Sequence, residues 1–100
     1  MQKSIASHEY RLFLEKLRSA REHAGLTQID VADRLGETQS FVSKCERGER
    51  RLDIIEVRSF CAAIGTSLSA FAEDLEQFLR SAELPRQDRK RRKRASSNAQ

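Results

Sequence analysis

The sequence predicts an all-α fold of five helices. Apolar residues recur three and four positions apart along five stretches, which is the spacing of one face of an α-helix. Each of the first four stretches is followed by one of the four glycines, a residue that tolerates the left-handed conformation that ends helices. No alternating pattern typical of a half-buried strand competes with this interpretation.

The start of each later helix follows from residues that cap helices. Thr27 with Asp30, and Asp53 with Glu56, have the spacing of a capping box, in which two side chains satisfy backbone N–H groups at a helix start. The predicted N-caps are Thr27, Thr38, Asp53 and Ser67. Together with the glycines, they predict helices over residues 8–24, 28–35, 39–47, 54–64 and 68–82.

The apolar faces of these helices predict the core. We expect it to include Phe13, Leu14, Leu17 and Ala20 of the first helix, Val57, Cys61 and Ile64 of the fourth, and most of the apolar stripe of the fifth, which consists of Leu68, Phe71, Ala72, Leu75, Phe78 and Leu79. Cys45 and Cys61 occupy apolar positions, so we interpret them as small core residues, although the sequence leaves a bond between them open. The two Cys and two His lack the spacing of zinc ligands, and we expect no metal and no cofactor.

The net charge of +4 is unevenly divided along the chain. Residues 1–85 carry 12 Lys and Arg against 14 Asp and Glu, a charge of −2, whereas residues 86–100 carry 7 against 1, a charge of +6. The run RKRRKR occupies residues 89–94. We therefore expect a flexible N-terminus over residues 1–7, one folded domain over 8–84 and a disordered basic tail over 85–100. Phosphate contacts of the domain must then come from a local basic patch.

Residues 26–48 have the pattern of a helix-turn-helix. Two short helices that cross closely need a small residue at the crossing, a turn of unusual backbone conformation and an apolar residue in the corner. Ala32, Gly36 and Val42 provide these features, at spacings of four and six residues. Small polar and basic side chains point outward from the second helix, which is typical of a helix that enters the major groove of DNA.

These residues resemble the Cro/C1-type, or XRE-like, helix-turn-helix family. The matching segments are LRSAREHAGLTQIDVADRLG, then QSFVSKCERGER, then LDIIEVRSFCAAIGTSL, which together lie within about residues 13–68. The resemblance implies a five-helix, lambda-repressor-like DNA-binding domain that binds a palindromic operator as a dimer. It implies a transcriptional regulator, more often a repressor, and no enzyme.

The resemblance also assigns roles to residues of the motif. The residues that it places against base edges are Gln39, Ser40 and Lys44. Their chemistry agrees, because glutamine can bond adenine N6 and N7 together and lysine can donate to guanine O6 and N7. The expected phosphate contacts are Thr27, Gln28, Ser43, Arg47, Arg50 and Arg51. In the family, the counterpart of Gln28 also steadies the counterpart of Gln39.

One further pair of residues is expected to stabilise the fold, and another set is expected to join two copies of the chain. Arg21 and Glu46 match a structural ion pair between the first helix and the end of the third. Phe78 and Leu79, near the end of a fifth helix of about four turns, are expected to be exposed in a monomer and to bind a second copy. The predicted dimer interface comprises Leu75, Phe78, Leu79 and Tyr10.

The main alternative is an antitoxin that binds a toxin protein through the fifth helix and the tail and regulates its own gene. The basic tail is interpreted first as a source of sequence-independent attraction to DNA phosphates. The alternatives are a segment that binds RNA or another acidic partner, and a solvated terminus that keeps the protein soluble. No stretch has the length of a membrane span, and we expect no membrane partner. The expected location is the cytoplasm, associated with the nucleoid when bound to double-stranded DNA.

Overall fold

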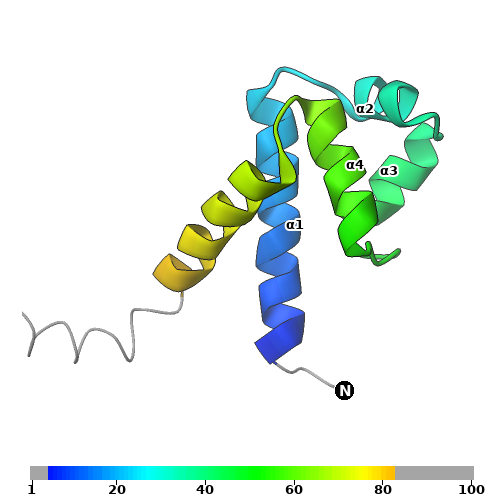
Figure 1. Cartoon of the computed structure of the whole chain (residues 1–100). Helices are drawn as coiled ribbons and strands as arrows, with labels where there is room; N and C mark the ends of the chain where they lie inside the picture. The colour runs from blue at the N-terminus through cyan, green and yellow to red at the C-terminus, as the bar shows by residue number, and fades with distance from the viewer. Residues whose placement is uncertain (1–4, 83–100) are drawn as a thin grey trace, which may run out of the picture.

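The computed structural model describes residues 5–82, and this part of the chain is folded into five α-helices without a strand. The helices are α1 (Ile5–His23), α2 (Gln28–Leu35), α3 (Gln39–Glu46), α4 (Ile54–Ile64) and a C-terminal helix, Leu68–Ala82. The long α1 contacts α3 and, through Phe13 and Phe71, the C-terminal helix (Figure 1). The all-α fold with a helix-turn-helix is therefore confirmed.

The predicted helix bounds agree with the structure at all but three positions. Helices α1 and α3 end at His23 and Glu46, each one residue early, and α1 begins at Ile5. Residues 5–7, expected to be flexible, are thus helical, and they contain no glycine or proline that would interrupt the helix. The basic run and the rest of the predicted tail lie outside the described residues.

The expected caps form the hydrogen bonds that capping requires. The Oγ1 of Thr27 accepts from the backbone N–H of Asp30, and the Asp30 carboxylate accepts from the N–H of Thr27 in return, at 3.1 and 2.8 Å. Asp53 and Glu56 form the same reciprocal pair at 2.8 and 2.9 Å. The side-chain oxygens of Thr38 and Ser67 each accept one backbone N–H of the following helix. All four predicted N-caps are confirmed.

The turn between α2 and α3 depends on Gly36. Its φ of 72° lies in the left-handed region, which glycine adopts without a steric cost. The turn brings α2 and α3 into contact, and Ala32 and Val42 are both buried in the core, with 2% and 0% of their surface exposed. The two helices therefore meet as a rigid pair, as the sequence predicts.

The core lies between α1, α4 and this pair. The buried apolar residues are Phe13, Leu14, Leu17, Val31, Ala32, Val42, Cys45, Val57, Phe60, Cys61, Ala63, Ile64 and Phe71. Phe60 and Ala63 were not predicted, and Ala72, which was, is exposed. Cys45 and Cys61 are buried free thiols, as expected, and burial raises the pKa of both.

The exposed apolar residues differ from the prediction. Phe78 and Leu79, expected to be exposed, are half-buried, and the ammonium of Lys16 lies 5.5 Å from the centre of the Phe78 ring. The large apolar side chains that are exposed in the described part of the chain are Ile29, Ile54 and Ile55. The C-terminal helix contacts α1 through Phe71, whose ring packs against that of Phe13, and through Phe78 beneath Lys16, so part of its apolar stripe is covered within the monomer.

Among residues 5–82, no single helix has the length and apolar character needed to cross a membrane. Only α4 and the C-terminal helix taken together pass such a test, by length and composition, and they are bent by 104° relative to each other. Five of the eleven α4 residues are buried in the core, which accounts for the apolar composition of that helix.

Candidate nucleic-acid interface

Helix α3 presents a polar face that is open to a ligand. Thr38 caps this helix, so that Gln39 and Ser40 occupy its first turn, and Lys44 lies one turn after Ser40. All three side chains are exposed. Within residues 5–82, the side chains of Ser40 and Lys44 form no hydrogen bond or ion pair, so their donors are available.

Gln39 differs from these two residues because it is held in place. Its Nε2 donates to the Oε1 of Gln28 at 2.8 Å. Gln28 begins α2, so the bond joins the start of one helix to the start of the other across the turn. The structure thus brings together the two glutamines that the resemblance linked, one expected at a phosphate and one at a base.

Behind the glutamines lies the ion pair of Arg21 and Glu46. The Nε and Nη2 of Arg21 donate to the two carboxylate oxygens of Glu46, at 2.7 and 3.0 Å. The side chains are only 10% and 5% exposed. The hydrogen bond to Glu46 raises the pKa of Arg21, and burial opposes it. The Nη1 of Arg21 donates to the backbone carbonyl of Leu26 at 2.9 Å, which ties α1 to the start of the motif.

Sequence reasoning missed the bond that connects these two pairs. The Nε2 of Gln28 donates to the Oε1 of Glu46 at 3.0 Å, so the glutamines and the ion pair form one network. A signal for it existed, because Glu46 follows the buried Val42 by four residues and must lie on the inner edge of α3. A carboxylate there needs several donors to compensate for its burial.

The arginines that follow α3 are all engaged within the chain. Arg47 donates through Nη1 to the hydroxyl of Ser43 and through Nε to Glu49, the latter at 3.0 Å. This pairing raises the pKa of Arg47 and lowers that of Glu49. The guanidinium of Arg51 lies 4.1 Å from the centre of the Tyr10 ring. The basic patch is therefore ordered but partly neutralised.

Tyr10 has contacts inside the monomer that the sequence did not predict. Its hydroxyl accepts from the backbone N–H of Leu52 at 3.1 Å, and its ring packs beside Phe13 with centroids 5.2 Å apart. Leu75, Phe78 and Leu79 are also half-buried. The four residues expected at a dimer interface thus keep part of their surface free, on α1 and the C-terminal helix.

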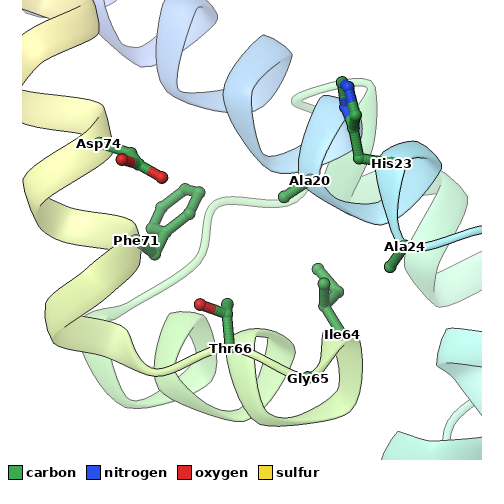
Figure 2. A pocket seen from close by; sticks show the side chains of 8 residues that line it. All are labelled: Ala20, His23, Ala24, Ile64, Gly65, Thr66, Phe71 and Asp74. Atoms are coloured by element: carbon green, nitrogen blue, oxygen red, sulfur yellow. The ribbon is translucent and has the colours of Figure 1, made fainter.

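A separate hollow of about 300 Å³ lies away from the helix-turn-helix. Figure 2 shows His23 at the end of α1 and Asp74 on the C-terminal helix on its two sides, with Ile64 and Phe71 between them. None of its lining residues belongs to α2 or α3. In the described part of the chain, no group of His, Cys, Asp and Glu has the arrangement of a metal site.

Comparison with known proteins places this geometry in a family. The helix-turn-helix family model HTH_3 matches residues 17–71, which is more than half of the chain. The chain belongs to the Cro/C1-type XRE family. Among solved structures, an XRE-family like protein from Pseudomonas syringae pv. tomato str. DC3000 is 49% identical, with a TM-score of 0.69, over 73% of this chain and 89% of that one. The comparison with curated proteins gave no match.

XRE-family proteins are DNA-binding transcriptional regulators, and the resemblance seen in the sequence is confirmed. The matched segment begins at Leu17 and ends at Phe71, and it includes α2, α3 and the Arg21–Glu46 pair. The candidate interface is therefore the outer face of the helix-turn-helix itself.

Proposed function

We propose that the chain is an operator-binding repressor that inserts α3 into the major groove of DNA. The observation that carries this proposal is the exposed face of Gln39, Ser40 and Lys44, with Gln39 held by Gln28 across the turn. In the proposed complex, Gln39 bonds adenine, Lys44 donates to guanine, and Ser40 contacts a neighbouring base edge.

The proposed backbone contacts surround this face. Thr27 and Gln28 lie at the start of α2, where the free N–H groups and the helix dipole favour a phosphate. Ser43 and Arg47 lie along α3 and at its end, and Arg50 and Arg51 follow in the loop. Because Arg47 and Arg50 are paired with carboxylates, DNA binding requires a phosphate to share or replace those partners.

We further propose that two copies bind a palindromic site. Two-fold dimers of helix-turn-helix proteins place their recognition helices in successive major grooves, about 34 Å apart. The proposed contact uses the free surface of Leu75, Phe78 and Leu79, with Tyr10 beside it. A dimer on an operator represses by blocking access of the polymerase to the promoter.

Selection of bound sequences from a random DNA pool tests the proposal. A palindromic site with half-sites one helical turn apart is the expected result. Gln39→Ala and Lys44→Ala should each weaken binding to that site by about 1–3 kcal/mol and relax preference at one base pair per half-site. Arg18→Ala, which removes an exposed charge from α1, is the control and should leave base preference unchanged. Equal losses on selected and random DNA would argue against base reading by Gln39 and Lys44.

The antitoxin hypothesis stays a prediction, because it depends on a second protein. Co-purification of a toxin with the full chain would support it. The random-pool selection would still give a site in that case, since an antitoxin of this kind also binds its own promoter.

A further inference from the structure

A continuous series of hydrogen bonds runs from the buried ion pair to the outer face of α3. It passes from Arg21 through Glu46 and Gln28 to Gln39, with distances of 2.7, 3.0 and 2.8 Å. We propose that Glu46 is a positioning residue for DNA recognition, because it fixes the orientation of the Gln28 amide and thereby the orientation in which Gln39 meets a base. This inference rests on the proposed function of Gln39 as a base-contacting residue.

The chemistry of Glu46 determines which group donates and which accepts in each hydrogen bond of the series. An ionised carboxylate only accepts hydrogen bonds, and both oxygens of Glu46 already accept from the guanidinium of Arg21. Gln28 can join them only by turning its Nε2 toward Glu46, as observed. The Oε1 of Gln28 must then face the opposite way, toward Gln39.

The same reasoning determines which donor and acceptor groups of Gln39 are free to contact a base. Because the Oε1 of Gln28 can only accept, Gln39 uses one of its two Nε2 protons to donate to it. One N–H and the oxygen of Gln39 remain free. Adenine offers one donor and one acceptor in the major groove, and this pair matches it, whereas guanine offers two acceptors and requires two donors. The series therefore favours adenine over guanine at the base that faces Gln39.

The burial of Arg21 and Glu46 keeps the Gln28 amide in the observed orientation. The side chains of Arg21 and Glu46 are almost fully enclosed, so water has little access to replace either partner. A reversed Gln28 amide would place its oxygen against a carboxylate oxygen, which is repulsive. The cost of that arrangement is highest where the surroundings have a low dielectric constant.

Glu46→Gln tests the proposal with little change in size. The new amide has a donor as well as an acceptor, so Gln28 is free to turn over and Gln39 is free to present two N–H groups. The measurement compares the affinities of the full chain for two duplexes of the selected site that differ only in adenine or guanine at the base assigned to Gln39. For wild type we expect a discrimination of about 5- to 150-fold, which should fall severalfold in Glu46→Gln.

A double-mutant comparison separates this role from a general structural one. Adding Glu46→Gln to Gln39→Ala should cause no further loss of discrimination, because the residue that Glu46 orients is absent. Glu49→Gln is the matched control, since it removes a carboxylate that pairs with Arg47 outside the series. It should alter affinity for all sequences alike and leave the discrimination unchanged.

A measurement without DNA tests the series in the wild-type protein. Nuclear magnetic resonance should show one side-chain amide proton of Gln28 and one of Gln39 exchanging with water more slowly than those of Gln77, which is exposed on the C-terminal helix. Exchange as fast as that of Gln77 would overturn the proposal, even if Glu46→Gln fails to fold. Unchanged discrimination in a folded Glu46→Gln protein would also overturn it. Retained discrimination in Gln39→Ala would instead overturn the proposed function of Gln39.

Discussion

The guanidinium of Arg50 donates to both carboxylate oxygens of Glu56, at 3.1 and 2.9 Å, and joins the loop after α3 to the first turn of α4. Arg50 also lies over the ring of Phe41, 4.9 Å from its centre. Glu56 in turn accepts from the backbone N–H of Asp53 as the second half of a capping box. One carboxylate thus orders the loop arginine and starts the next helix.

The pairing of Glu56 with Arg50 predicts that the stability of the fold falls at acidic pH. The hydrogen bond from Arg50 and, next, that from Asp53 lower the pKa of the Glu56 carboxyl. A carboxyl whose pKa is lower in the folded than in the unfolded chain stabilises the fold at pH values above its unfolded pKa, which is about 4.3 for glutamate. This stabilisation is lost as the pH falls through the pKa of the folded state. We expect Glu56→Gln to lose less stability than wild type between pH 7 and pH 3. Urea unfolding at both pH values measures this, with Glu73→Gln, an exposed residue of the C-terminal helix, as control. Equal acid sensitivity of wild type and Glu56→Gln would contradict the assignment.

Removal of one partner of the buried ion pair should destabilise the domain strongly. Arg21→Ala leaves Glu46 buried without its main donor, and such losses are typically ~3–5 kcal/mol. Arg18→Ala removes an exposed arginine paired with Glu22 one turn away, and should cost only about 0.3–0.5 kcal/mol. Chemical unfolding of both variants provides the comparison. Similar values for the two would mean that the Arg21–Glu46 pair is no more important than a surface pair.

The proposed dimer surface can be tested against the exposed isoleucines. Leu79→Ser should weaken self-association because it removes apolar surface from the proposed contact, whereas Ile55→Ser should not, although Ile55 is 66% exposed. Sedimentation velocity across a range of concentrations distinguishes the two, after circular dichroism has shown that both variants are folded. A monomer at Ile55→Ser and a dimer at Leu79→Ser would move the interface to the start of α4.

Deletion of residues 86–100 should weaken binding to all DNA alike. This segment carries a net charge of +6, and the slope of log affinity against log salt should become shallower by about 0.9 for every phosphate that the shortened chain no longer neutralises. Titrations of the selected site and of random DNA at several salt concentrations measure the slope. A deletion that changes only the preferred sequence would refute sequence-independent attraction as the role of the tail.

Most of the fold could be predicted because local signals determine it. The capping boxes at Thr27 and Asp53 and the glycine at position 36 act over a few residues, and the structure has each of them as expected. The helical spacing of apolar residues located the core, although it missed Phe60, which lies one position before Cys61 and shares its buried face.

The network behind the interface was harder to predict because it connects distant residues. The pairing of Arg21 with Glu46 was expected only from the family resemblance, and the bond from Gln28 to Glu46 was not predicted. The bonded residues lie 25 and 18 positions apart in the sequence. The same holds for Tyr10, whose hydroxyl meets a backbone N–H 42 positions away. Long-range polar contacts depend on how the helices pack, which periodicity does not describe.

The contacts of the three loop arginines have a thermodynamic consequence. Arg47, Arg50 and Arg51 are held by a carboxylate or an aromatic ring before any nucleic acid arrives. A long side chain that is immobilised only in the complex costs about 0.5–1.5 kcal/mol of conformational entropy, and here folding has already restricted that freedom. The surface is preorganised, so less of the gain from each new phosphate contact is spent on ordering the protein.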